Sequence, residues 1–200
     1  MAMASQSPGR RERNKQAKLD RITEAASELF SRYGVDEVTT QQVAEAADIG
    51  TGTLFLYAKS KGELLLLVQN AHYAAALDRG RTAASGRDDV LSAVMALLTP
   101  IVECNRVQVE NGRTYLREMV FGDPAEPRHA EALSIVGETE RATAGILARL
   151  AGSSEDEAST LAGVVSAILF LTMASSVHEG SSVDDIVEAI RVQIAAILPG

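Results

Sequence analysis

Apolar residues recur at the spacing of an α-helix along almost the whole chain, and no segment sustains the alternation of a β-strand. The clearest stripe is C-terminal, with members three, one, three, four and three residues apart: Val183, Ile186, Val187, Ile190, Ile194 and Ile197. Capping signals and glycines divide the chain into segments of ordinary helix length. The sequence therefore predicts an all-α fold of about nine helices.

Composition indicates the environment of the protein. Hydrophobic residues make up 46% of 200 residues, enough for a core of ordinary size. Cys104 is the single cysteine, so the chain forms no internal disulfide. No signal peptide is recognised, and the most apolar stretch, residues 161–173, is shorter than the roughly 18 residues of a membrane span. We therefore expect a soluble cytoplasmic protein.

The charge is unevenly distributed. The whole chain has a net charge of −8, but residues 1–61 hold nine Lys and Arg against eight Asp and Glu. Five basic residues lie within the first 19, opposed by Glu12 alone. A nearly neutral N-terminal part with a basic tip is compatible with binding a polyanion there, although a solvated basic tail would have the same composition.

Two short helices joined by a tight turn are predicted near the N-terminus. Thr39 and Gln42 have the spacing of a capping box and begin a helix at about residues 40–46. A turn at residues 48–50 follows, and then a short helix at about residues 51–57. Before them lies a helix from about Lys15 to Tyr33. This succession is the sequence pattern of a helix-turn-helix.

The stretch DIGTGTLFLYAKSKGELLLLV, residues 48–68, combines glycines, threonines and lysines and suggests a backbone that meets phosphate. A nucleotide-binding glycine loop needs a preceding strand and a third glycine, but the segment before Gly50 is helical and the third position is Phe55. Small and polar residues at the start of a recognition helix instead suit close approach to DNA. An ordinary capped turn between structural helices is the alternative.

Residues 21–68 resemble the DNA-binding domain of the TetR family of bacterial transcriptional repressors. The matching positions follow the family pattern in order and spacing over nearly 50 residues, about a quarter of the chain. They are Leu29, Phe30, Gly34, Thr39, Thr40, Val43, Ala44, Ala47, Ile49, Gly52, Thr53, Leu54, Tyr57, Ser60, Lys61 and Leu64. The departures are Asp48, Gly50, Thr51, Phe55 and Ala58, and they bear on operator recognition rather than on the fold.

The resemblance implies a set of DNA-contacting residues. Phosphate contacts are expected from Thr39, Thr40, Thr53, Tyr57 and Lys61, and base contacts from Gln41, Thr51, Gly52 and Leu56. Arg10, Arg11 and Arg13 are expected to form an arm in the adjacent minor groove. The implied domains are a flexible basic arm at 1–14, the helix-turn-helix domain at 15–62, and an effector-binding and dimerisation domain at 63–200.

The resemblance also implies a homodimer and a small-molecule effector. We expect the last two long helices to form the dimer interface, through Leu161, Val164, Val165, Ile168, Ile186, Ile190 and Ile194. Candidate residues for an apolar effector pocket are Met95, Leu98, Cys104, Tyr115, Met119, Phe121, Phe170, Met173 and His178. The resulting hypothesis is a regulator of double-stranded DNA, most simply a repressor that an apolar ligand releases from a palindromic operator.

An enzyme and a helical interaction protein are the two alternative classes. The three histidines lie in different segments, without a second ligand at metal-binding spacing, so we expect neither a metal site nor a cofactor. No arrangement of side chains favours an enzyme. A helical interaction protein with weakened DNA binding is the remaining alternative, because Asp48 and Phe55 replace residues that are usual in the family.

Overall fold

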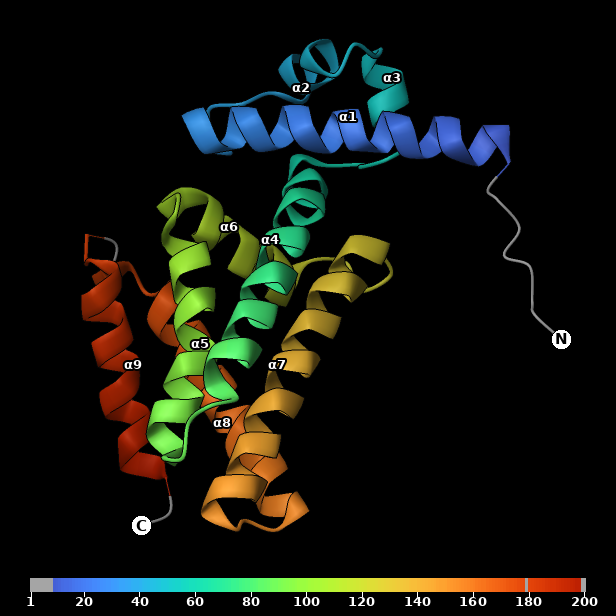
Figure 1. Cartoon of the computed structure of the whole chain (residues 1–200). Helices are drawn as coiled ribbons and strands as arrows, with labels where there is room; N and C mark the ends of the chain where they lie inside the picture. The colour runs from blue at the N-terminus through green and yellow to red at the C-terminus, as the bar shows by residue number, and fades with distance from the viewer. Residues whose placement is uncertain (1–8, 179, 199–200) are drawn as a thin grey trace, which may run out of the picture.

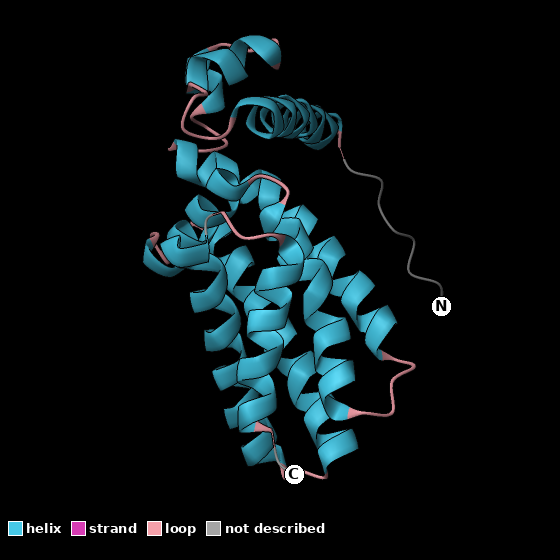
Figure 2. Ribbon diagram, turned by 90° about the vertical axis from the view of Figure 1, so that its left-hand side faces the viewer, coloured by secondary structure: helices cyan, strands magenta, loops and turns pink. Residues whose placement is uncertain are grey.

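The computed structural model describes residues 9–178 and 180–198, and within these ranges the chain is helical without strands. This described part of the chain contains nine α-helices and one short 3-10 helix, which confirms the predicted fold class (Figures 1 and 2). Their bounds are α1 Arg10–Tyr33, α2 Thr40–Ala46, α3 Thr51–Leu54, α4 Lys61–Ala84, α5 Val90–Arg106, α6 Val109–Phe121, α7 Pro127–Ala151, α8 Glu155–Ala174, η1 Ser176–His178 and α9 Val183–Ile197.

The helices form a small head on one end of a larger bundle. Helices α1 to α3 make up the head, which lies across the end of the bundle formed by α4 to α9 (Figure 1). Helix α4 leaves the head and runs into the bundle, where it packs against α5, α6 and α7. Since α4 also contacts α1, it is the element that the head and the bundle share.

Side-chain caps set many of the helix boundaries. Complete capping boxes begin α2 at Thr39, α8 at Ser154 and α9 at Ser182. At the start of α4, the Ser60 hydroxyl accepts from the backbone N–H of Glu63, but the Glu63 carboxylate accepts from the backbone N–H of Lys59 instead of that of Ser60, so the capping box there is only half formed. Backbone polar groups at these ends are thus satisfied by neighbouring side chains.

Glycines allow the closest contacts within the bundle. A Cβ added at Gly80 of α4 would lie 2.1 Å from the carbonyl oxygen of Leu97 on α5. Similarly, one added at Gly112 of α6 would lie 2.2 Å from the carbonyl oxygen of Asn105. Helices α4 and α6 therefore each approach the backbone of α5 closely at a glycine.

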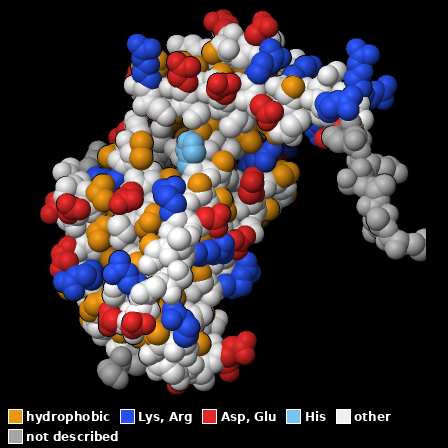
Figure 3. Space-filling view, in the orientation of Figure 1, with side chains coloured by type: hydrophobic (Ala, Val, Ile, Leu, Met, Phe, Trp, Pro, Cys, Tyr) orange, Lys and Arg blue, Asp and Glu red, His pale blue; other side chains and the backbone are white. Residues whose placement is uncertain are grey.

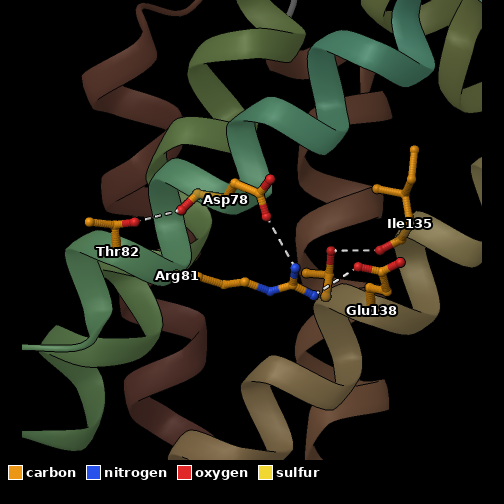
Figure 4. A network of polar contacts seen from close by, with 6 residues as sticks. Asp78, Arg81, Thr82, Ile135 and Glu138 are labelled. Carbon is orange, nitrogen blue, oxygen red and sulfur yellow. Dashed lines mark hydrogen bonds and ion pairs between the residues drawn. The ribbon is translucent and has the colours of Figure 1, made fainter. Parts of the chain in front are cut away.

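A polar network links α4 to α7 on the outside of the bundle (Figure 4). The guanidinium of Arg81 bonds Asp78 on its own helix at 3.2 Å and Glu138 on α7 at 2.9 Å. All three side chains are exposed to solvent, so such pairs contribute only about 0–1 kcal/mol each. The apolar core beneath them holds the two helices together.

Two elements differ from the sequence-based expectations. Helix α1 begins at Arg10, so residues 10–14, expected in a flexible arm, are helical. Helix α8 extends over 20 residues, from Glu155 to Ala174, and is long and apolar enough to cross a membrane by length and composition alone. Core helices of soluble proteins meet the same criterion.

Candidate nucleic-acid interface

Helices α2 and α3 and the turn between them have the geometry of a helix-turn-helix. The turn contains Asp48, which adopts a φ of 53°, in the left-handed region. Helix α3 begins after Gly50, which has no side chain with which to cap it, and a hydrogen-bonded turn continues from Leu54 to Ala58. The predicted helix at 51–57 is thus a four-residue helix followed by this turn.

A small apolar core fixes these helices on α1. Val43 and Ala44 of α2 and Leu54 of α3 are each no more than 1% exposed, and they belong to the same core as Ile22 and Phe30 of α1. Burial of Val43 and of Leu54 contributes roughly 1.5–3 kcal/mol each. The inward faces of α2 and α3 are therefore committed to the head, and their other faces are directed outward.

The residues predicted to contact DNA on α2, on α3 and next to them are all at least partly exposed. Thr39, Gln41 and Gly52 are exposed, and Leu56 is 83% exposed although it is apolar. The half-buried members are Thr40, Thr51, Thr53, Tyr57 and Lys61. None of the nine is enclosed in the subunit, so the arrangement leaves all of them accessible to a duplex.

Besides Thr39, whose hydroxyl caps α2 through Gln42, two of these side chains already have partners. The ammonium of Lys61 donates to the carbonyl of Asp36 at 3.1 Å, and the amide of Gln41 donates to Glu45 at 3.0 Å. Both contacts are exposed, and exposed contacts exchange readily with water or with a ligand. A DNA phosphate could therefore replace Asp36 as the partner of Lys61, and a base edge could replace Glu45 as the partner of Gln41.

Basic residues gather at the N-terminal end of α1 (Figure 3). Arg10, Arg11, Arg13, Lys15 and Lys18 are all exposed on this helix. The three arginines expected in a minor-groove arm are therefore presented by the first turns of α1, beside the α2–α3 surface rather than on it. This placement fits contacts to backbone phosphates at the edge of a binding site.

A cavity of about 70 Å³ lies between α4, α5, α6, α7 and α8. Its lining is mainly aliphatic and aromatic: Tyr73, Ile101, Tyr115, Leu116, Met119, Ala132, Ile135, Val136, Thr139, Ser166, Leu169, Phe170 and Met173. No charged side chain is among these described lining residues. Tyr73 and Tyr115 stack with their ring centroids 4.3 Å apart.

The tyrosine hydroxyls connect the cavity to buried asparagines. Tyr115 donates to Asn70 at 3.0 Å, while Tyr73 accepts from Asn105 at 2.7 Å. Burial raises the pKa of both tyrosines above the usual range, so both remain neutral at physiological pH. The cavity is therefore uncharged, with hydroxyl groups along part of its wall.

Four of the nine residues predicted for an effector pocket line this cavity, namely Tyr115, Met119, Phe170 and Met173. The other five lie elsewhere. Met95 and Leu98 are buried on α5 away from it, and Cys104 lies in a surface groove between the head and the bundle. Phe121 is 80% exposed at the end of α6, and His178 ends the 3-10 helix η1.

The predicted dimer-interface residues divide in a similar way. Val165, Ile186, Ile190 and Ile194 are no more than 1% exposed, because they pack inside their own subunit, so they are unavailable to a partner. Their assignment to the interface was wrong. Val164 is 42% exposed, and Leu161 and Ile168 are half-buried. The stripe on α9 thus faces its own bundle, whereas α8 has an outward apolar face.

Sequence reasoning missed most of the cavity wall. The contribution of α7 comprises Ala132, Ile135, Val136 and Thr139, which recur at helical spacing. That spacing identifies a buried face but not the helices it meets.

No group of histidine, cysteine and carboxylate side chains that could hold a metal ion occurs within residues 9–178 and 180–198.

Comparison with known proteins gives a consistent result. Residues 22–68 match the family described as bacterial regulatory proteins, tetR family. No curated protein sequence matches the chain. Among solved structures, a TetR transcriptional regulator from Rhodococcus sp. RHA1 aligns with a TM-score of 0.67 and 21% identity, covering 92% of this chain and 97% of that chain.

Two FadR structures are also similar to this chain. FadR from Thermus thermophilus, a TetR family repressor in complex with lauroyl-CoA, has a TM-score of 0.70 and 22% identity, covering 90% of this chain and 92% of that one. The fatty acid degradation regulator FadR from Bacillus halodurans has a TM-score of 0.63 and 14% identity, with coverage of 96% and 98%. Residues 22–68 therefore belong to the tetR family of bacterial regulatory proteins, and the whole chain has the fold of TetR regulators.

Proposed function

We propose that this chain is a cytoplasmic transcription regulator that binds double-stranded DNA through the outward face of α2 and α3. The observation that carries the proposal is the accessibility of the polar face of a helix-turn-helix within the segment that matches the tetR family. Gln41 is suited to pair with adenine, and Leu56 to touch a thymine methyl group. The basic end of α1 would add phosphate contacts.

The regulator works as a homodimer in this proposal, with α8 at the interface. Thr160, Val164, Ala167 and Leu171 form an exposed stripe along α8, four, three and four residues apart. The most apolar 18-residue stretch of α8 has a mean hydropathy of 1.6, but only 33% of its residues are buried in the subunit. A second copy would cover this face, and the small side chain of Ala167 favours close packing of the two helices. One head of the dimer would then bind each half of a palindromic operator, that is, each half-site.

The effector is a neutral, largely apolar molecule, or one with an apolar chain that enters the cavity. The uncharged lining supports this class, because burying an unpaired charge there would cost several kcal/mol. The fold shared with FadR bound to lauroyl-CoA also favours an acyl chain. Binding would release DNA by shifting the population of head positions, and a shift from 99:1 to 1:99 requires roughly 5.5 kcal/mol of differential affinity. The chain would then act as a repressor.

Fluorescence anisotropy with DNA that flanks the gene of this protein tests the DNA-binding function. We expect tight binding that competitor DNA of scrambled sequence does not displace and that weakens steeply between two salt concentrations. Gln41→Ala should reduce the preference for this DNA over scrambled DNA. Equal, weak binding of both DNA molecules would contradict the proposal and favour a helical interaction protein.

A second assay tests the effector class. Lauric acid and lauroyl-CoA are added to the protein–DNA complex, with free coenzyme A as the matched control that lacks an acyl chain. We expect release by at least one of the acyl compounds and none by coenzyme A. A cavity-filling variant, Ala132→Leu, should bind DNA but respond less, because Ala132 is fully buried in the cavity wall. Equal responses of the parent and this variant would exclude the cavity as the effector site.

A further inference from the structure

Asn111, near the start of α6, is bonded to the head at two points. Its side-chain oxygen accepts from the backbone N–H of Val35 at 2.7 Å, and its side-chain nitrogen donates to the backbone carbonyl of Phe30 at 2.9 Å. Both bonds are buried, and Asn111 is 2% exposed. Phe30 lies in the last turn of α1 and Val35 follows the break after it, so one amide holds both sides of the end of α1.

The chain conformation at this place suits such a contact. Gly34, between the two partners of Asn111, has a φ of 80°, which residues with a Cβ rarely adopt. A Cβ there would also lie 2.7 Å from the side-chain nitrogen of Gln108, the N-cap residue of α6. The backbone after α1 therefore lies directly against the first turn of α6.

The same helix also borders the cavity. Tyr115, Leu116 and Met119 of α6 contribute to the cavity wall, and Tyr115 is one helical turn beyond Asn111. At a rise of 1.5 Å per residue, their Cα atoms are separated by about 6 Å along a rigid helix. A displacement of α6 caused by an occupant of the cavity would thus reach Asn111 undiminished.

Buried hydrogen bonds make this attachment strong compared with the exposed ion pair between the head and α7. If α6 moved without the head, the buried N–H of Val35 would lose its partner, which is costly, and the carbonyl of Phe30 would keep only the N–H of Gly34. By contrast, the ion pair of Lys59 with Glu126 at the N-terminus of α7 leaves Lys59 72% exposed, and exposed pairs hold their partners weakly. When α6 and α7 move relative to each other, we expect the head to move with α6, to which Asn111 attaches it, rather than with α7.

We propose that Asn111 is a positioning residue that fixes the orientation of the head relative to the bundle and links it to the cavity through α6. The link to DNA release rests on the function proposed above, but the orienting role does not. Without Asn111 the head would sample a wider range of orientations. Two recognition surfaces would then match the two half-sites less often, so binding to DNA would weaken.

Distances between spin labels within one subunit test the orienting role. Labels are placed on the exposed positions of Ala46→Cys on α2 and Ala148→Cys on α7, in a Cys104→Ser background. An excess of unlabelled chain ensures that distances between subunits do not contribute. The variants are Asn111→Leu, which removes both hydrogen bonds, and Asn111→Ser, which serves if the leucine variant does not fold. Thr172→Val is the control, since it removes a hydrogen bond to Gln193 far from the head.

We expect a narrow distance distribution for the parent and for Thr172→Val, and a distribution roughly twice as wide for Asn111→Leu and Asn111→Ser. DNA binding by the two Asn111 variants should be about tenfold weaker. A folded Asn111 variant, with parental helicity by circular dichroism, that keeps the narrow distribution would overturn the inference. Because the label experiment uses neither DNA nor effector, its result is independent of whether the proposed function holds.

Discussion

Asp48 is a single residue whose backbone carries measurable strain. Its φ of 53° is unfavourable for residues with a Cβ, and its side chain is 98% exposed, with a 3.5 Å ion pair to Arg21 as compensation. We predict that Asp48→Ala lowers the free energy of unfolding by about 1 kcal/mol, whereas Asp48→Gly leaves it unchanged or raises it slightly. Urea denaturation measures both. Equal effects of alanine and glycine would show that the ion pair, not the backbone, dominates.

Cys104 and the stacked tyrosines predict a loss of stability at alkaline pH. Burial raises the pKa of the Cys104 thiol from its ordinary 9.0 to about 11, and it raises the pKa of Tyr73 and Tyr115 as well. Between the unfolded and folded values the folded state binds more protons, so its stability falls as pH rises. Urea denaturation from about pH 8 to about pH 10.5 should show this decline. In Cys104→Ala the decline should be smaller, and an unchanged decline would mean that the thiol does not contribute.

Residues of the candidate site were predictable to different degrees. The exposure of Thr39, Gln41 and Leu56 followed from the resemblance of residues 21–68 to a known helix-turn-helix domain, and their contact with DNA stays a prediction. The cavity wall could not be predicted, because it is formed by five helices whose mutual rotation depends on packing over the whole bundle. Asn111 gave no signal in the sequence, where an asparagine before a glycine is typical of a turn.

At the scale of elements, two glycines make a matched pair for testing helix packing. Gly80 on α4 has the backbone of α5 where its Cβ would lie, whereas Gly145 on α7 has nothing within 4 Å. Gly80→Ala should therefore destabilise the protein by about 1–3 kcal/mol or more, since backbone must move. Gly145→Ala should stabilise it by up to about 1 kcal/mol, because alanine is the better helix former. Thermal denaturation measures both, and a neutral Gly80→Ala would contradict the close contact of α4 with α5.

Helix boundaries were the best-predicted feature of the elements. Thr39 with Gln42 forms the capping box expected from its spacing, because this interaction is local in the chain. The start of α1 was placed too late. Its first turns are rich in charged residues without an apolar stripe, and such a segment has the same composition as a flexible tail.

For the whole molecule, the exposed stripe on α8 predicts which substitution separates the subunits. Leu171 is 65% exposed at the end of this stripe, so Leu171→Glu should yield a folded monomer by analytical ultracentrifugation. Val107→Glu is the control, because Val107 is 82% exposed and belongs to the junction of α5 and α6 rather than to α8. Loss of the dimer in both variants, or in neither, would show that the interface is not on this stripe.

The sequence alone predicted a dimer through α9 as well as α8, and the α9 part was wrong. An isoleucine stripe at helical spacing requires burial but does not say against what. In the structure it packs against α5 and α8 of its own subunit. The outward stripe on α8 is less apolar and contains Thr160 and Ala167, so its pattern is less conspicuous although its exposure is greater.

The central claim is that paired heads read DNA through α2 and α3, and hydroxyl-radical footprinting tests it most directly. The DNA is selected from a random pool for tight binding to the full chain. We predict two protected patches of matching sequence, related by a two-fold axis and separated by about 34–36 Å, one helical turn, or a multiple of it. Gln41→Ala should weaken protection of both patches equally. A single patch, uniform protection, or a footprint that Gln41→Ala leaves unchanged would contradict the account.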